Sequence, residues 1–415
     1  MKVPLASSGL RARDIAAAEA VLNSGRLTMG DKVAEFEQKM AQYLGVRYFV
    51  MVNSGSSANL VIFEAMLRPS KGKPLLSAGD GVLVPAVAWP TTIWPVIQLG
   101  LRPVFVDVDK DSIAIDLNLA RTLLERDPGI KAIFPIHPLG FGLDGVALRK
   151  FAHQNSIYLI NDVCESLGSW RNNLHAGTSG LAASFSFYFS HHITTMEGGG
   201  VATNSLEFAN DLRAIRSHGW SRDRFDVEEW NKKSINKLLT SGISINQSKF
   251  QFITTGYNVR PMEIQAAIGL EQLQSLDDFI AKRRVVAKSV KQALEDTVFQ
   301  VIDCGSLNGA EEESSHSWML ICIRVNRSLS QEDRMKIETS LEAFEIESRP
   351  VLTGNFLNQP AISLLRNMPN GNEFPVADYI SKNYFMVGAH HDLTDTQIDY
   401  LSTSLRSIAS SLGSA

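Results

Sequence analysis

The chain has 415 residues, of which 44% are hydrophobic and 20% charged, and its formal net charge at pH 7 is -4. This length can bury a large core and predicts one big domain together with a smaller one. The slightly acidic balance provides no basic field, which argues against nucleic acid or an anionic membrane surface as a partner.

The cysteines and the N-terminus narrow the class further. Cys164, Cys304 and Cys322 are widely spaced, so they predict neither a disulfide framework nor a zinc site. Three thiolates are also too few for an iron-sulfur cluster held by four, and we expect no metal. The first residues lack the apolar core of a signal peptide, which makes the cytoplasm the expected location.

A stretch without charged residues lies between Asp80 and Arg102 and is long enough to raise the question of a membrane span. Prolines at positions 85, 90 and 95 interrupt it at regular intervals. The pattern therefore predicts a short buried strand, a loop and a helix that begins near Thr91, and no membrane-spanning segment.

Apolar runs of strand length alternate with amphipathic stretches of helix length from about residue 45 to residue 205. This alternation is typical of α/β proteins with a mostly parallel sheet, whose strands are apolar throughout because both faces are covered. The predicted strands are residues 48–52, 81–85, 103–108, 132–136 and 158–161, with helices over 57–67 and from about 91.

The pattern changes after residue 220. Residues 221–256 are rich in charged and polar side chains and predict a long excursion, which is either an active-site lid, a subunit contact or a solvated insertion without a role. Helical periodicity resumes over residues 261–287. We therefore expect a large domain over residues 1–280, which includes the polar insertion, and a smaller α+β domain over residues 281–415.

The first candidate binding element follows the predicted strand at 48–52. Its sequence, Asn-Ser-Gly-Ser-Ser-Ala-Asn over residues 53–59, places a glycine and small hydroxyl side chains at a helix N-terminus. Unpaired amides and the helix dipole favour a phosphate there, and Ser56 and Ser57 are the candidate ligands. A serine-rich helix cap without a ligand would explain the motif as well.

Two later elements carry groups suited to a flat heterocycle. Trp89 offers a broad face for stacking, although core packing would also account for it. Asp162 follows an apolar strand, at the sheet edge where ligands collect in open α/β folds, and its carboxylate could pair with a protonated ring nitrogen. A helix cap is the alternative role for Asp162. Glu165 could face a ring oxygen or be solvated.

The segment 184–199 is the most informative in the chain. It reads Ser-Phe-Ser-Phe-Tyr-Phe-Ser-His-His-Ile-Thr-Thr-Met-Glu-Gly-Gly, an aromatic and serine-rich strand that enters a polar turn. Ser186 could reach the same phosphate as Ser56 and Ser57. His191 is a candidate general base, because an imidazole exchanges protons near neutral pH but forms no stable Schiff base with an aldehyde. A surface histidine at a strand end is the alternative.

Taken in order, these motifs resemble the nucleotide-sugar aminotransferases of fold type I, which use pyridoxal phosphate. The match covers about residues 5–290 and includes a final Gly-Tyr-Asn followed by Glu-Ile-Gln-Ala-Ala within residues 256–267. Those enzymes carry a lysine where this chain has His191. The His-His pair in place of Lys-Asn is similar to the 3-dehydratase branch of the family.

The resemblance implies pyridoxal or pyridoxamine 5'-phosphate bound without a covalent link. The serines at 56, 57 and 186 would hold its phosphate, Trp89 would stack on its ring and Asp162 would pair with its nitrogen. The resemblance also implies a homodimer with shared active sites, in which Asn258 reaches the cofactor phosphate of the neighbouring subunit. His218 and Arg349 are candidate substrate contacts, with ordinary structural roles as the alternative.

The implied activity is removal of the C3 hydroxyl of a nucleotide-linked 4-keto-6-deoxyhexose, with His191 as acid and base. L-glutamate is the expected donor that restores the amine form of the cofactor. Family members with an iron-sulfur cluster act on CDP sugars, so the missing cysteines favour GDP-4-keto-6-deoxymannose, while CDP, dTDP and UDP sugars stay open. An aminotransferase with free cofactor and a catalytically silent sugar-nucleotide binder are the alternatives.

Overall fold

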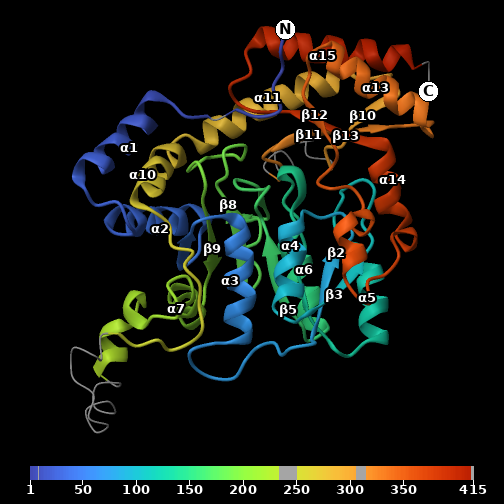
Figure 1. Ribbon diagram of the computed structural model, residues 1–415. Coiled ribbons are helices and arrows are strands. Elements are labelled where there is room, and N and C mark those ends of the chain that lie inside the picture. Colours follow the sequence, from blue (N-terminus) through green and yellow to red (C-terminus); the bar gives the residue numbers. More distant parts are fainter. Residues whose placement is uncertain (8, 233–249, 305–314, 413–415) are drawn as a thin grey trace.

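The computed structural model describes residues 1–7, 9–232, 250–304 and 315–412. Its centre is a seven-stranded sheet in the order β1-β9-β8-β5-β4-β2-β3 (Figure 1). Strand β9 runs antiparallel to both neighbours, and the other neighbouring pairs are parallel. The strands are β1 (Tyr48–Val52), β2 (Gly81–Pro85), β3 (Arg102–Val106), β4 (Ile130–Ile133), β5 (Tyr158–Asp162), β8 (Ala182–Ser186) and β9 (Gly199–Thr203).

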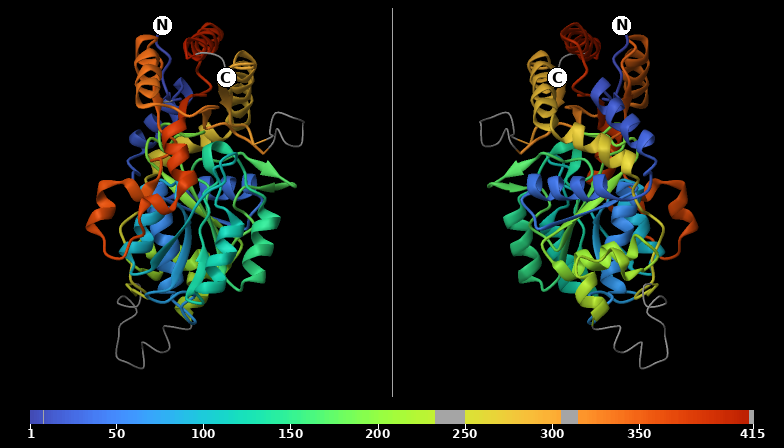
Figure 2. Two further views of the ribbon diagram at one scale, coloured as in Figure 1. Left: turned by 90° about the vertical axis from the view of Figure 1, so that its right-hand side faces the viewer. Right: turned by 90° about the vertical axis from the view of Figure 1, so that its left-hand side faces the viewer.

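Helices cover both faces of this sheet, so successive side chains of a strand enter different cores (Figure 2). In β1, Val50 and Val52 belong to the cluster beneath helices α3, α4 and α7, whereas Phe49 and Met51 belong to the cluster beneath α2. This confirms the predicted α/β class with a mostly parallel sheet. The helices of this part are α1 (Ala12–Ser24), α2 (Asp31–Leu44), α3 (Gly55–Leu67), α4 (Pro90–Gln98), α5 (Leu117–Arg126), α6 (Gly145–Gln154) and α7 (Leu206–Ile215), and a small hairpin joins β6 (Trp170–Arg171) to β7 (Leu174–His175).

A smaller antiparallel sheet, in the order β10-β11-β13-β12, lies in the C-terminal part of the chain. Its hydrophobic cluster runs from Val286 to Leu412 and also contains Val3, which forms a parallel bridge with Ile346. The predicted boundary near residue 280 stays a prediction. The elements are β10 (Phe299–Val301), β11 (Leu320–Val325), β12 (Ser348–Arg349), β13 (Tyr384–Gly388), α11 (Leu276–Ala293), α13 (Gln331–Ala343), α14 (Pro375–Asn383) and α15 (Asp395–Ser411).

The predicted helix over residues 261–287 is wrong as one element, because the chain forms α10 (Glu263–Leu273) and then α11 (Leu276–Ala293). The break falls at Ser275, whose φ of -114° and ψ of 5° are not helical. Arg11 stabilises it by donating to the Ser275 hydroxyl at 2.7 Å and to the Glu271 carbonyl at 3.2 Å. These bonds satisfy groups that the end of α10 leaves without intrahelical partners.

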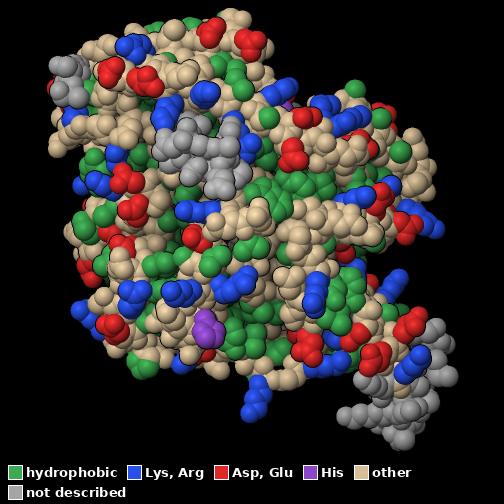
Figure 3. All heavy atoms as spheres, turned by 180° about the vertical axis from the view of Figure 1, so that it is seen from behind, with side chains coloured by type: hydrophobic (Ala, Val, Ile, Leu, Met, Phe, Trp, Pro, Cys, Tyr) green, Lys and Arg blue, Asp and Glu red, His purple; other side chains and the backbone are tan. Residues whose placement is uncertain are grey.

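The structure describes the polar insertion only at its ends, because residues 233–249 lie outside the described residues. The predicted lid or subunit contact falls mostly on those residues and stays a prediction. Trp220 forms an antiparallel bridge with Phe252, and its ring stacks on Phe250 at a centroid distance of 5.3 Å. No helix in the described ranges is both long and apolar enough to cross a bilayer. Acidic and basic side chains are interspersed on the face shown in Figure 3.

Candidate active site

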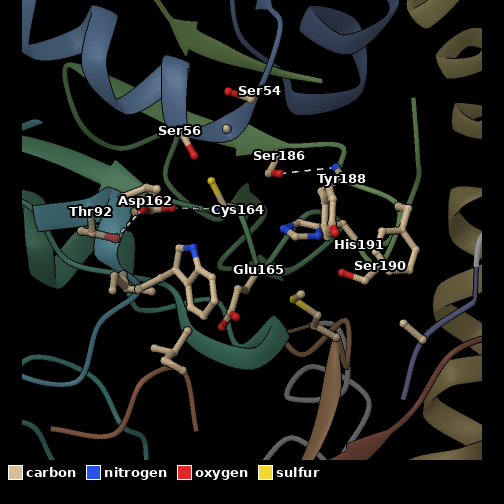
Figure 4. Close-up of a pocket in the computed structure, with 18 of the residues that line it drawn as sticks. Ser54, Ser56, Thr92, Asp162, Cys164, Glu165, Ser186, Tyr188, Ser190 and His191 are labelled. Carbon is tan, nitrogen blue, oxygen red and sulfur yellow. Dashed lines mark hydrogen bonds between the residues drawn. The ribbon is translucent and has the colours of Figure 1, made fainter. Parts of the chain in front are cut away.

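A cavity of about 630 Å³ lies at the carboxyl ends of the parallel strands, where the central sheet meets the C-terminal part. Ser54 and Ser56 reach it from the turn after β1, Asp162 from the end of β5 and Ser186 from the end of β8. Arg349 of the smaller sheet also lines it. Polar groups of distant segments converge here because the parallel strands end at one edge of the sheet (Figure 4).

The N-terminus of α3 forms one wall of the cavity. Ser54 caps the helix by accepting a hydrogen bond from the Ser57 amide at 3.1 Å, and the two hydroxyls lie 3.0 Å apart. Ser56 lines the cavity, while Ser57 does not and serves instead as the partner of the Ser54 cap. Ser54, which the sequence analysis did not single out, takes the wall position. Ser54 could have been found from the sequence, because it is a further serine of the same motif, two residues before Ser56.

Glycines allow this wall to pack tightly. A Cβ on Gly55 would lie 2.6 Å from the Cβ of Ser186, so only glycine lets the α3 N-terminus approach the end of β8. A Cβ on Gly199 would lie 2.4 Å from the carbonyl carbon of Ser54. The Glu-Gly-Gly segment therefore brings β9 directly behind the α3 N-terminus. Together these contacts place the hydroxyls of Ser56 and Ser186 beside unpaired helix amides.

Asp162 lies at the floor of the cavity and is only 4% exposed. Its Oδ2 accepts a hydrogen bond from Thr92 Oγ1 at 2.8 Å, and its Oδ1 accepts one from the Cys164 amide at 3.1 Å (Figure 4). Its Oδ2 also accepts a hydrogen bond from Asn59 Nδ2 at 2.9 Å. Three donors fix the orientation of the carboxylate. Thr92 and Asn59 were missed by sequence reasoning, because each is a polar helix residue whose partner is far away in the sequence. Trp89 also lines the cavity, and 47% of its surface is exposed.

His191 reaches the cavity from the turn that follows β8 (Figure 4). Its amide donates to the Tyr188 carbonyl at 2.9 Å, which closes the turn. Its ring Nδ1 is buried and has no hydrogen-bond partner among the described residues. Burial, with smaller effects from the charges of Arg349 and Arg283, lowers the pKa of His191 to about 3. The imidazole is therefore neutral at pH 7 and can act as a proton acceptor.

His192 does not line the cavity and is 1% exposed. Its Nε2 lies 3.2 Å from the carbonyl oxygen of Ser317, which requires the tautomer that carries hydrogen on Nε2. Burial, followed by the charge of Arg283, lowers the pKa of His192 well below its ordinary value, so this neutral form persists. Of the two adjacent histidines, His191 therefore lines the cavity, whereas His192 attaches the turn to Ser317.

An ion pair spans the cavity wall between the two parts of the chain. Glu165 Oε1 lies 3.6 Å from a guanidinium nitrogen of Arg349, and Glu165 Oε2 accepts a hydrogen bond from the Leu139 amide at 2.8 Å. Burial raises the pKa of Glu165, whereas the Arg349 charge and the Leu139 amide lower it. The cavity therefore offers both a cationic and an anionic contact to a polar ligand.

Three of the predicted site residues do not line this cavity, namely Ser57, His218 and Asn258. His218 is exposed, has a φ of 65°, and donates from its amide to the Tyr257 carbonyl at 2.8 Å. Asn258 forms an antiparallel bridge with Ser217. Neither residue lines the cavity of its own chain. The carboxylate of Glu263, in the same motif, instead binds the Gly30, Lys32 and Val33 amides and so caps α2.

A mostly parallel seven-stranded sheet, a smaller C-terminal sheet and a cavity at the strand ends define the aminotransferase fold. Among solved structures, an E. coli GDP-4-keto-6-deoxy-D-mannose-3-dehydratase with bound hydrated PLP matches with a TM-score of 0.83 and 35% identity, over 99% of both chains. The chain belongs to the DegT/DnrJ/EryC1/StrS aminotransferase family, which matches residues 9–406.

Two curated relatives lie in the same branch of the family. A GDP-4-keto-6-deoxy-D-mannose 3-dehydratase of Yersinia pseudotuberculosis is 37% identical over 397 residues, which is 94% of this chain and 95% of the relative. One of Escherichia coli O55:H7 is 36% identical over 401 residues, which is 96% of this chain and 98% of the relative. A similar solved structure contains a trapped PLP-glutamate geminal diamine, with a TM-score of 0.83 and 35% identity over 98% of this chain and 100% of the other.

Proposed function

We propose that the protein is a nucleotide-sugar 3-dehydratase that removes the C3 hydroxyl of GDP-4-keto-6-deoxymannose. The observation that carries the proposal is His191, whose side chain lines the cavity at the position where aminotransferases of this fold carry their cofactor lysine. The relatives named above as 3-dehydratases, at 36% and 37% identity, support the same activity.

The cavity fits pyridoxal or pyridoxamine 5'-phosphate. Asp162 presents a fixed, buried carboxylate that can pair with a pyridine nitrogen, and Trp89 offers a face for the ring. The phosphate would be held by Ser56, Ser186 and the amides at the start of α3. Position 55 must be glycine for this arrangement, because a Cβ there would collide with the side chain of Ser186. No lysine lines the cavity, so the described residues provide no amine that could tether the cofactor.

Bound in its amine form, the cofactor would supply an amino group for the 4-keto carbon and the two electrons by which hydrogen replaces the C3 hydroxyl, with its aldehyde form and ammonia as the further products. His191 supplies the proton transfers. Its neutral ring would take a proton from the cofactor carbon that bears the amine. The resulting imidazolium is a strong acid because burial disfavours it, and it protonates the departing hydroxyl, which leaves as water.

Arg349 and Glu165 are placed to orient the reactants. The Arg349 guanidinium can bind the carboxylate of L-glutamate, the proposed donor that restores the amine form of the cofactor, or the diphosphate of the sugar nucleotide. Glu165 can accept a hydrogen bond from the cofactor ring oxygen or a sugar hydroxyl. The similar solved structure with a trapped PLP-glutamate geminal diamine supports glutamate as the donor.

The active protein in this proposal is a homodimer in the cytoplasm. Asn258 does not line its own cavity, which agrees with a role at the cofactor phosphate of the neighbouring subunit. Ser57 contributes through the helix cap that it forms with Ser54. His218, which is exposed, is available for a contact with substrate bound in the other subunit.

The experiment is product analysis by mass spectrometry with pyridoxamine phosphate, glutamate and a panel of GDP-, CDP-, dTDP- and UDP-linked 4-keto-6-deoxyhexoses. We expect catalytic formation of a GDP sugar that lacks one oxygen, and only when glutamate is present. An amino sugar as the product would show an aminotransferase with free cofactor. No turnover with any sugar, despite cofactor binding, would show a silent binder and contradict the proposal.

A further inference from the structure

Arg283 is a buried cation directly behind the active-site turn. It lies on α11, is 1% exposed, and has no carboxylate within ion-pair distance among the described residues. Its guanidinium instead donates to three main-chain carbonyls, those of Trp318 at 3.1 Å, Met319 at 2.9 Å and His191 at 3.2 Å. Burial lowers the pKa of Arg283 to about 10, so the group is still charged at neutral pH.

These bonds tie the active-site turn to the start of β11. His191 is held through its carbonyl by Arg283, and the next residue, His192, is held through its ring by the Ser317 carbonyl. The receiving segment is itself constrained, because Trp318 has a φ of 53° and its ring stacks on His316 at a centroid distance of 3.8 Å. The turn therefore has two independent attachments to one rigid loop.

The cost of this arrangement points to a role in the site. Among the described residues, Asp392 is the one carboxylate whose charge favours the Arg283 cation, and it does so without forming an ion pair. A buried charge without a carboxylate in direct contact is destabilising by several kcal/mol unless hydrogen bonds replace its hydration, and neutral residues could fill the same space at less cost. Here the Arg283 Nε has no partner among the described residues, so even the hydrogen bonds are incomplete. Buried groups of this kind are concentrated at functional sites.

We propose that Arg283 is a positioning residue, which fixes the His191 main-chain carbonyl against the C-terminal sheet and so places the imidazole for proton transfer. The inference rests on the proposed function in one respect, that His191 is the proton-transfer group. The cation also opposes protonation of His191, as does Arg349 from β12. The other titratable or charged groups that line the cavity around His191 are Asp162, Cys164, Glu165, Tyr188, Glu197 and Glu347.

The test compares Arg283→Met with Arg283→Lys in single turnovers of the protein loaded with pyridoxamine phosphate. We expect Arg283→Met to slow dehydration roughly 10- to 100-fold, as a misplaced catalytic group does, and to move the acid limb of the pH profile upward. Arg283→Lys keeps the charge without the planar fork, so it should restore the wild-type pH profile and only part of the rate.

A readout without substrate separates this inference from the proposed function. In protein with ¹³C-labelled histidine, the His191 signal, assigned with His191→Gln, should begin to titrate at a higher pH in Arg283→Met than in the wild type. Arg324→Met is the matched control, because that guanidinium on β11 pairs with Asp111 and touches neither histidine. It should keep the wild-type rate and His191 titration.

The outcomes are distinguishable. If Arg283 only stabilises the fold, Arg283→Met will lower the melting temperature while the folded fraction keeps the wild-type rate, pH profile and His191 titration, and this would overturn the inference. If the wild type itself removes no oxygen from any sugar, the proposed function fails, and the titration of His191 in the two variants still decides whether Arg283 acts on that ring.

Discussion

Thr92 donates a hydrogen bond to Asp162 across 2.8 Å, although the two residues are 70 positions apart in the chain. Thr92 is in the first turn of α4, which begins immediately after Trp89. The bond therefore couples the carboxylate at the floor of the cavity to the helix that carries the stacking face. Asn59 of α3 binds the same oxygen, so two helices orient one carboxylate.

Replacing Thr92 by Val should weaken cofactor binding without unfolding the protein. The change keeps the shape and removes one hydrogen bond to a charged group, worth about 1.5–3 kcal/mol, which corresponds to roughly tenfold or more in the dissociation constant of pyridoxamine phosphate. Fluorescence titration with pyridoxamine phosphate measures this dissociation constant. The same change at Thr122, whose hydroxyl binds only the Asn118 carbonyl on exposed α5, should leave the dissociation constant unaltered.

Trp89 and Trp94 lie five positions apart in the sequence and should respond differently to Ala. Trp89 is 47% exposed in the cavity, so its loss should weaken pyridoxamine phosphate binding by roughly tenfold and leave the melting temperature nearly unchanged. Trp94 packs on Phe356 at a centroid distance of 5.2 Å, so its loss should cost about 3–5 kcal/mol of folding stability. An equal loss of stability in both variants would refute the assignment of Trp89 to the cavity.

Acid should destabilise the fold through its buried histidines. Burial is the main cause that lowers the pKa of His137 to about 4 and those of His175 and His316 to about 3. In the unfolded chain these histidines become protonated below about pH 6.5, whereas in the folded chain they stay neutral down to about pH 3 to 4. Stability is complete above that window and falls as the pH drops through it.

The magnitude is up to about 1.4 kcal/mol per pH unit for each such histidine. Urea unfolding at pH 7.5 and at pH 5.0 measures the difference. His137→Gln, which removes one of these groups, should make the pH dependence shallower even if it lowers stability at pH 7.5. A dependence as steep as in the wild type would contradict the assignment of His137 as a group that stays neutral.

Shared active sites predict complementation between two inactive variants. His191→Ala lacks the proton-transfer group of its own cavity, and Asn258→Ala lacks the proposed contact with the neighbour's cofactor phosphate. In a mixed dimer one of the two cavities contains both wild-type residues, so mixing and reassociation should restore activity toward a quarter of the wild-type value. Mixtures that remain as inactive as the separate variants would show that Asn258 acts within its own subunit or not at all.

The central sheet was accessible from the sequence because parallel strands covered on both faces are apolar throughout, and β1, β2 and β5 fall within one residue of their predicted limits. Strand β9 was not, because Gly199 and Gly200 have little strand propensity. The need for glycine at these positions is seen only in the structure, where a Cβ on Gly199 would collide with the Ser54 carbonyl carbon and one on Gly200 with the Phe49 ring.

The chemistry-bearing residues of the site were predictable for a different reason. Asp162 and Ser186 end strands and His191 lies in the turn after a strand, and strand ends converge in this class of fold. Their supports were not predictable, because Asn59, Thr92 and Arg283 lie in helices and find their partners over long separations in the chain. Nothing local distinguishes such a residue from an ordinary polar helix position.

The central claim is that His191 moves the protons that remove the C3 hydroxyl. The most direct test is the mass of the sugar nucleotide released in a single turnover, without glutamate, from GDP-4-keto-6-deoxymannose and protein loaded with pyridoxamine phosphate. We expect the wild type to release a product one oxygen atom lighter, and His191→Gln to return unchanged substrate although it binds the cofactor. An oxygen-deficient product from His191→Gln at the wild-type rate, or an amino sugar from the wild type, would contradict the account.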